Sequence, residues 1–406
     1  MKKNTILIIF AFALLFLAVS CGNALNDDSK ENDPGKTDNE DPGNKQTPPV
    51  LNEGDLSIHF LELGNKYVGD CVYINYGTMD VIIDAGSKHD SASTIIAYIN
   101  NYIQDDKVEY VIATHAHEDH IAGFYSNYYV KGILDAYEIG TIIDYPLTNN
   151  NTKTRENYEN ARDNLVATKG TVHYNALQCY NEENGAKRIY DLGGNVKLEI
   201  LYSQFYETYS AKENNYSVAV KISQEIDGFI NQYIFTGDME IEAEDGLVDF
   251  YETSGGLGHC VLYKGGHHGS NTSSNVKLMA AVSPEYVCVC SCAGTYEYAF
   301  NVERNRFPSQ GFIDRVAPYT DAIYVTSFIE NKAAYDAGDV KPFNGTIVFL
   351  VSNGEFSINC SNNNLKLKDT EWFKNNRDLP STWQYSEPVL PESVLLPAAV
   401  SMYPRP

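Results

Sequence analysis

The chain has 406 residues, with 54 acidic side chains, 30 lysines and arginines, and a formal net charge of −24. Such an acidic protein repels polyanions at long range. This argues against tight non-specific binding to nucleic acid, which needs lysine and arginine to displace counterions.

The N-terminal residues 1–20 are predicted to be a signal peptide. Met1-Lys2-Lys3 is basic, and the apolar run over 6–19 that follows is short for a transmembrane helix. The small residues before Cys21 are typical of a bacterial lipobox, in which the cysteine is lipidated. The alternative is an ordinary cleaved signal. We therefore expect an exported lipoprotein, periplasmic or on the cell surface, that is anchored to a membrane through Cys21.

Three further segments follow the signal. Residues 21–53 are predicted to form a disordered acidic tether, because polar residues, Gly and Pro leave them little apolar surface to bury. Residues 54–380 form the predicted globular domain, and residues 381–406 a Pro-containing C-terminal tail. With Cys21 lipidated, an odd number of the eight cysteines remains, so they make no complete disulfide framework. No obligate protein partner is evident.

The globular domain opens with a predicted meander followed by a helix and a strand. The three strands of the meander are separated by Gly-containing turns and span 56–64, 69–76 and 81–86. His59 lies in the first of them, and its alternating pattern predicts packing rather than metal binding. Isoleucines at helical spacing predict a helix over 91–102. The apolar run 108–113 then predicts a strand in a sheet covered by helices.

The rest of the domain alternates strands with a few helices. A helix is expected over 158–168, and strands over 171–174, 196–201, 214–222, 233–239, 260–264 and 286–292. The last of these strands places Cys288, Cys290 and Cys292 on one face as small buried residues. The late strands are expected to complete the second sheet, at 322–327, 346–351 and 355–359, before a short helix over 368–377.

Metal-binding side chain types collect where predicted apolar strands end. The stretch after the strand 108–113 reads His-x-His-x-Asp-His over 115–120, and Asp238 and the pair His267-His268 each follow another strand. Five of the nine histidines lie in two of these loops. Neutral imidazoles and carboxylates are good ligands for Zn²⁺ and similar ions, so the sequence predicts a metal site. The alternative is a polar loop with incidental histidines.

These motifs resemble the metallo-β-lactamase superfamily, and within it the branch of the ComEC-type competence hydrolase domain. The resemblance covers about 56–350 and is carried by the motifs at 115–120, 236–238 and 266–270. It implies a fold of the α/β class, an αββα four-layer sandwich with a metal cleft at one edge of its two sheets.

The resemblance also implies a ligand set for two divalent ions. Zn²⁺ is expected, but histidine and aspartate ligands also suit Mn²⁺ or Fe²⁺. The expected metal ligands are His115 and His117 for one ion, Asp119, His120 and His267 for the other, and Asp238 as the bridge. His268 is kept as a ligand or phosphate contact, and Asp84 is expected either to orient a ligand histidine or to be a turn residue. Many members of the superfamily use a further histidine, for which only His173 is available here.

Two ions roughly 3.5 to 4 Å apart can share a water and lower its pKa towards neutrality, which supplies a hydroxide. Asp119 is expected to orient it, while His268 and Ser270 hold a phosphate or an oxyanion. We therefore predict a hydrolase of phosphodiester bonds, in an envelope polymer, a phosphorylated head group or nucleic acid. Two alternatives stay open. One is an extracellular nuclease of the ComEC type, and the other is a surface lipoprotein that binds metal without turnover.

Overall fold

The computed structural model describes residues 49–295 and 306–386, apart from the side chain of Cys292. These residues belong to one compact unit, Asn44–Pro406. The predicted signal peptide, Cys21, most of the predicted tether and most of the C-terminal tail lie outside the described residues. Among the described helices, none is both long and apolar enough to cross a membrane.

The first sheet contains eight strands in the described part of the chain, in the order β16-β15-β1-β2-β3-β4-β5-β6. Its strands are β1 (Leu56–Phe60), β2 (Val72–Tyr76), β3 (Met79–Ile83), β4 (Lys107–Ala113), β5 (Glu138–Asp144), β6 (Val172–Asn175), β15 (Ile347–Ser352) and β16 (Glu355–Cys360). The strands β1, β2 and β3 form the predicted antiparallel meander, whereas β3 to β6 run parallel. This sheet is therefore mixed.

The second sheet also contains eight described strands, in the order β14-β13-β12-β11-β10-β9-β8-β7. They are β7 (Ile189–Gly193), β8 (Val196–Ile200), β9 (Val220–Ile226), β10 (Phe229–Phe235), β11 (Leu262–Lys264), β12 (Tyr286–Ala293), β13 (Ile323–Phe328) and β14 (Lys341–Pro342). Here β10 to β13 run parallel, and the edge strands are antiparallel. Each sheet thus has one parallel block.

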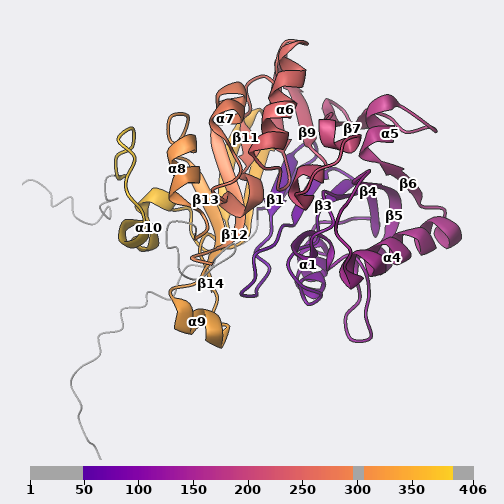
Figure 1. Ribbon diagram of the computed structural model, residues 1–406, viewed down its shortest axis with the longest axis horizontal. Coiled ribbons are helices and arrows are strands. Elements are labelled where there is room, and N and C mark those ends of the chain that lie inside the picture. The colour runs from indigo at the N-terminus through magenta and orange to yellow at the C-terminus, as the bar shows by residue number, and fades with distance from the viewer. Residues whose placement is uncertain (1–48, 296–305, 387–406) are drawn as a thin grey trace, which may run out of the picture. The chain divides into compact units, whose positions relative to one another are not determined.

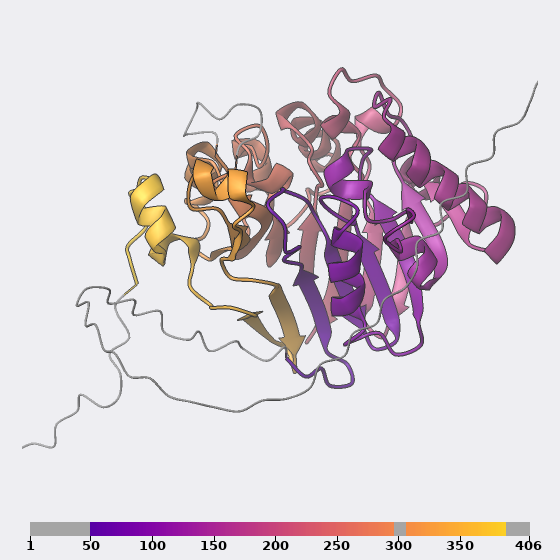
Figure 2. The same cartoon turned by 90° about the horizontal axis from the view of Figure 1, so that it is seen from below.

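Helices cover the outer side of each sheet. The α-helices in the described residues are α1 (Ser91–Ile99), α2 (Glu118–Ile121), α3 (Ile133–Ala136), α4 (Lys153–Lys169), α5 (Ala176–Asn181), α6 (Ile241–Glu252), α7 (Val276–Val282), α8 (Gln310–Val316), α9 (Lys332–Ala337) and α10 (Glu371–Asn376), and α9 buries none of its residues. In Figure 1, α6 and α7 lie along the upper side and α1 and α4 along the lower side, with the strands between them. The view from below in Figure 2 shows α1 in front of the strands of the first sheet.

The two sheets pack face to face through apolar side chains. Phe60 of β1 stacks on Phe235 of β10, with ring centroids 6.4 Å apart. Alternation along β12 sends Cys288 into this layer between the sheets, and sends Val287 and Val289 into the cluster under α6, α7 and α8. The cysteines at 288 and 290 are buried free thiols on one face, as the alternation predicts.

Two elements differ from the sequence-based expectation. The strands β15 and β16 do not complete the second sheet, because β15 pairs with β1 in the first. Periodicity identifies a strand but not its partner. The expected strand over 214–222 begins only at Val220, since a 3-10 turn spans Glu213–Tyr216. The side chain of Asn215 explains the turn: it donates to Ser210 Oγ and accepts from the backbone N–H of Glu240, which competes with strand pairing.

Asp80 on β3 gives the fold a dependence on pH outside the metal-binding region. Burial raises the pKa of Asp80 from 3.8 to about 6, although hydrogen bonds from Tyr73 and Asn75 oppose the shift. Between those pH values the folded state keeps a proton that the unfolded chain has lost, so the free energy of unfolding falls as the pH rises. The full shift corresponds to about 3 kcal/mol.

We expect Asp80→Asn to flatten this pH dependence between pH 4 and pH 6. The amide oxygen still accepts from Tyr73 and Asn75, while the charge is gone. Urea unfolding at several pH values measures the effect, and Asp163→Asn on the exposed surface of α4 is the control that keeps the wild-type slope. An unchanged slope in Asp80→Asn would contradict the assignment.

Candidate metal centre

The parallel block of each sheet brings the predicted ligand loops together. Neighbouring parallel strands end at the same edge of a sheet, and their loops meet there. In the first sheet, β3 and β4 are parallel neighbours that lead into Asp84 and the loop of His115 to His120. In the second sheet, β10 and β11 are parallel neighbours that lead into Asp238 and the pair His267-His268.

Four side chains from these loops converge on one point. Ligand atoms of Asp119, His120, Asp238 and His268 all lie within 4.8 Å of one another. His120 Nε2 is 3.0 Å from Asp238 Oδ2, and His268 Nε2 is 3.2 Å from Asp119 Oδ2 and 3.3 Å from Asp238 Oδ2. The side chain of Asp119 is 30% exposed, whereas that of His268 is 1% exposed. Asp119 therefore stands at the mouth of the cluster.

The backbone is strained where the second sheet supplies its histidines. His267 and His268 both have positive φ values, of 46° and 55°. Left-handed backbone costs a non-glycine residue about 1–2 kcal/mol. Consecutive residues of this kind persist only when their surroundings hold them, and such strain gathers at functional sites.

Asp84 orients His120 from behind. His120 Nδ1 lies 2.7 Å from Asp84 Oδ2, so the other ring nitrogen is turned towards Asp238. The carboxylate of Asp84 also accepts hydrogen bonds from the backbone N–H and the hydroxyl of Thr114, each 2.8 Å long. A carboxylate behind a ligand histidine fixes its tautomer and its ring orientation. This contact is what the predicted role of Asp84 requires.

Opposite charges hold the cluster together. Burial by itself would raise the pKa of Asp238, but the charges of His120 and His268 outweigh it and hold that pKa well below its usual value. Burial would likewise lower the pKa of both histidines, yet the charge of Asp238 raises each above its usual value. A bound divalent cation would neutralise the carboxylate charges in place of the protonated imidazoles.

Asp70 and Lys264 extend the cluster, and we did not predict either as a site residue. Both are buried and form an ion pair, and Asp70 Oδ1 lies 3.1 Å from His268 Nδ1. Lys264 Nζ is also 3.7 Å from Asp238 Oδ1. Burial would lower the pKa of Lys264, but Asp70 and Asp238 outweigh it and raise that pKa. The sequence did contain a signal for Lys264, because a lone lysine ends a short apolar strand directly before the histidine loop.

His115 and His117 lie beside the four-residue cluster and face each other. A hydrogen bond joins His115 Nε2 and His117 Nδ1, which are 3.0 Å apart. Burial and the neighbouring imidazoles of His120 and His117 hold the pKa of His115 well below its usual value, so its ring is neutral, as metal binding needs. In the described part of the chain, neither residue belongs to a group of three or more converging ligands.

His173 is not placed as a further ligand for this pair. Its Nε2 lies 2.8 Å from Asp144 Oδ1, and Asp144 also accepts from Arg162 and Tyr158. His59, predicted to pack, is fully buried and hydrogen bonded to Tyr98 and Ser57. Neither histidine is in the converging groups found among the described residues.

The structure favours His268 over His267 as the ligand from this loop. His267 Nε2 lies 3.8 Å from Asp238 Oδ2, and its Nδ1 is 3.0 Å from Thr272 Oγ1. His268 points its Nε2 into the cluster, at 3.3 Å from the same Asp238 oxygen. The expected ligand was His267, but two adjacent histidines follow the same strand, and only the left-handed turn that carries them determines which ring enters the cluster.

Ser270 is not placed as the predicted contact for a phosphate or an oxyanion. Its side chain is fully buried, and its hydroxyl lies 3.0 Å from that of Thr272. Its backbone N–H donates to the carbonyl oxygen of His267. These bonds close the turn that presents the two histidines, so Ser270 supports the loop.

The donor set fits a divalent metal ion. Imidazole nitrogens and carboxylate oxygens converge within 4.8 Å, which is a typical combination for Zn²⁺ and for Mn²⁺. Asp238 Oδ1 is buried and accepts no hydrogen bond from the described residues. Lys264 Nζ is 3.7 Å away, beyond hydrogen-bond distance, so a bound cation would satisfy this buried oxygen.

Comparisons with known proteins find one family match and one short stretch of sequence identity. Residues 64–126 match the family model of the metallo-beta-lactamase superfamily. A segment of 79 residues is 40% identical to the competence protein ComA of Neisseria gonorrhoeae, and it covers 19% of this chain. The match spans only 11% of the length of that relative.

Two solved structures are similar over part of the chain. The metallo-beta-lactamase fold protein YhfI from Bacillus subtilis is 12% identical, with a TM-score of 0.36, over 68% of this chain and 96% of its own. A metallo-beta-lactamase from Cronobacter sakazakii is 17% identical, with a TM-score of 0.27, over 43% of this chain and 60% of its own.

The family model covers β2 to β4 and the motif that begins at His115, where the first sheet delivers its ligands. Around this segment the structure has two mixed sheets packed face to face, helices on both outer sides, and a His/Asp cluster where the parallel strands end. This chain has the metallo-β-lactamase fold, as the αββα prediction stated, with a His/Asp cluster suited to a divalent metal.

Proposed function

We propose that this protein is a metal-dependent hydrolase of phosphodiester bonds. The observation that carries the proposal is the convergence of Asp119, His120, Asp238 and His268 where parallel strands of the two sheets end. A divalent ion bound there would activate water near neutral pH and neutralise the developing charge on phosphate oxygens. The likeness of residues 64–126 to a superfamily of metal-dependent hydrolases supports the reaction class.

The residues of the metal centre would have different roles in hydrolysis. Asp238 and His120 would hold the metal from the buried side, while Asp84 keeps the His120 ring in its orientation. Asp119, whose side chain is 30% exposed, would be the ligand nearest to solvent, and its carboxylate would orient the attacking water. Lys264 offsets part of the negative charge behind Asp238.

His115 and His117 are the candidate ligands of a second ion. We propose that both turn from their mutual hydrogen bond towards a second ion. Their rings are only 4.7 Å apart, and a rotation of either ring would free two nitrogens. The loop that carries them is anchored, since the backbone N–H of Ala116 donates to Glu213.

Hydrolysis of bis-p-nitrophenyl phosphate by the metal-loaded protein tests the proposal. We expect release of p-nitrophenol that stops when a chelator removes the metal. The β-lactam nitrocefin, in parallel, distinguishes a phosphodiesterase from a lactamase. Failure to hydrolyse any phosphodiester, with metal bound, would rule the proposal out and leave a metal-binding surface protein.

We expect the two adjacent histidines to differ sharply in their effect on metal binding. His268→Ala is expected to weaken Zn²⁺ binding by at least about 100-fold. Loss of a group that only orients a metal ligand costs about 10- to 100-fold in affinity, and loss of the ligand itself costs more. His267→Ala is expected to weaken it less than about tenfold, because its Nε2 is further from Asp238. The two changes share a left-handed backbone and are matched controls. Titration against a competing chelator measures both, and the reverse order would make His267 the ligand.

The location of the protein in the cell is a prediction from the N-terminal sequence alone. A protein exported and anchored through a lipidated Cys21 would meet envelope polymers, phosphorylated head groups and extracellular nucleic acid. The net charge of −24 weighs against nucleic acid, whereas the local identity to a competence protein weighs towards it. A nuclease is therefore the second candidate.

A further inference from the structure

A pocket opens directly beside the exposed ligand of the metal centre. It has a volume of about 230 Å³, and Asp119 is one of its lining residues. The other residues that matter here are Lys66, Tyr67, Lys88, Glu118 and Tyr335. This volume is smaller than that of a typical site for a whole organic ligand, so the pocket suits one small group of a larger substrate.

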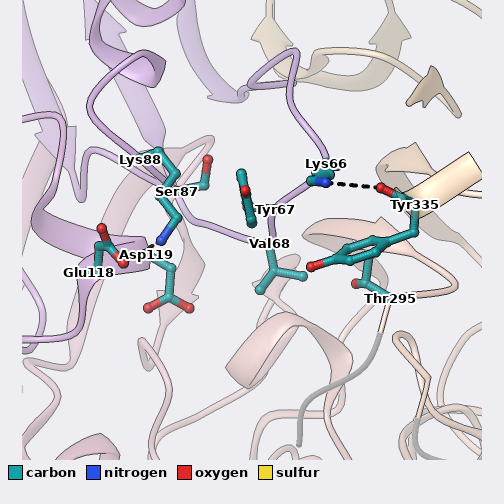
Figure 3. A pocket seen from close by; sticks show the side chains of 9 residues that line it. All are labelled: Lys66, Tyr67, Val68, Ser87, Lys88, Glu118, Asp119, Thr295 and Tyr335. Atoms are coloured by element: carbon teal, nitrogen blue, oxygen red, sulfur yellow. Dashed lines mark hydrogen bonds and ion pairs between the residues drawn. The ribbon is translucent and has the colours of Figure 1, made fainter. Parts of the chain in front are cut away.

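The pocket holds two lysines at fixed positions. Lys88 Nζ pairs with Glu118 and lies 5.0 Å from the centre of the Tyr67 ring. Lys66 Nζ donates to the carbonyl oxygen of Tyr335 and lies 4.9 Å from the centre of the Tyr335 ring. Figure 3 shows Tyr67 between the two lysines, with Asp119 on the side of Lys88. These contacts already restrict the two lysine side chains, so binding of a ligand group costs less side-chain entropy.

The lining of the pocket is less acidic than the chain as a whole, with two lysines against the two carboxylates of Glu118 and Asp119. The protein carries −24 overall, yet this pocket presents two ammonium groups next to the metal centre. Glu118 balances Lys88, and a bound metal would balance Asp119. Lys66 forms no ion pair with a carboxylate in the described part of the chain, so one positive charge remains. Such a pocket attracts an anion and repels a cationic head group such as choline.

We propose that this pocket binds a second phosphate group of the substrate, one unit along from the phosphodiester at the metal centre. The inference rests on the proposed function, and it narrows the substrate class to molecules with consecutive phosphates. A lysine ammonium is a common point-charge contact for phosphate. Chains of deoxynucleotides and of glycerol phosphate share this chemistry.

Binding of bisphosphates to the Zn²⁺-loaded protein tests the pocket without any turnover, because these ligands contain no phosphodiester. Calorimetry compares thymidine 3′,5′-bisphosphate with thymidine 5′-monophosphate, and glycerol 1,3-bisphosphate with glycerol 3-phosphate. We expect the bisphosphate to bind about tenfold more tightly in at least one pair, and the pair with the larger ratio identifies the source. Ratios near one in both pairs would overturn the proposal.

Three substitutions locate the effect. Lys66→Ala and Lys88→Ala are each expected to bring the affinity ratio towards one, and Glu118→Gln to increase it, since the change releases Lys88 from its ion pair. Lys374→Ala on α10 removes one exposed positive charge elsewhere and is expected to keep the wild-type ratio. Wild-type affinity ratios in both Lys66→Ala and Lys88→Ala would overturn the assignment to this pocket.

The outcome separates this inference from the proposed hydrolase. A wild-type bisphosphate ratio that depends on Lys66, in a protein that hydrolyses no phosphodiester, would leave an anion-binding pocket and exclude the enzyme. Turnover of bis-p-nitrophenyl phosphate without any bisphosphate preference would keep the enzyme and exclude the pocket.

Discussion

Asp238→Asn is expected to lower phosphodiester hydrolysis on the order of 10³-fold, because a metal ligand supplies several kcal/mol of charge stabilisation in the transition state. The substitution keeps the size of the side chain and removes the charge that faces His120 and His268. The same protein is expected to lose bound metal. Elemental analysis and the rate on bis-p-nitrophenyl phosphate measure the two effects.

Asp163→Asn is the control for this experiment. It removes one carboxylate charge from the exposed face of α4, and we expect wild-type metal content and rate. Circular dichroism shows whether Asp238→Asn is folded. Full activity in folded Asp238→Asn would exclude this residue as a ligand, and with it the metal centre described above.

Lys264→Met is expected to reduce the free energy of unfolding of the metal-free protein by about 3–5 kcal/mol. The side chain of Lys264 is 3% exposed and that of Asp70 is 2% exposed, so removing the ammonium leaves a buried carboxylate that keeps only its contacts with the imidazoles of His268 and His120. Methionine keeps the apolar stem of the lysine, which limits the loss to the charge. Urea unfolding in the presence of a chelator measures it.

The paired variant separates the charge from other effects of the substitution. Asp70→Asn with Lys264→Met removes both charges, and we expect it to recover most of the stability lost in Lys264→Met. The difference from the sum of the two single changes is the coupling between them. If Lys264→Met is as stable as the wild type, the ion pair does not stabilise the fold.

The sequence predicted much of the local structure because the signals are local. The apolar run before His115 predicts a strand, the isoleucine spacing after Asp90 predicts a helix, and both occur, as β4 and α1. The turn at Asn353-Gly354 joins β15 and β16 as a hairpin, with positive φ at both residues. The partner of β15 was assigned to the wrong sheet, since the choice depends on contacts between residues far apart in the chain.

Composition and spacing by themselves determined that this chain has metal-binding side chains where apolar strands end, because strand periodicity and ligand chemistry are both written in neighbouring residues. Only the tertiary structure decided which of them meet. Two sheets had to pack before His268, rather than His267, could reach Asp119 and Asp238. The same packing buried Lys264 against Asp70, although the two residues are far apart in the chain, with Asp70 just before β2 of the first sheet and Lys264 in β11 of the second. It also placed Lys66 and Lys88 in a pocket beside Asp119. Burial and distance set the charges of such groups, and neither is readable from a sequence alone.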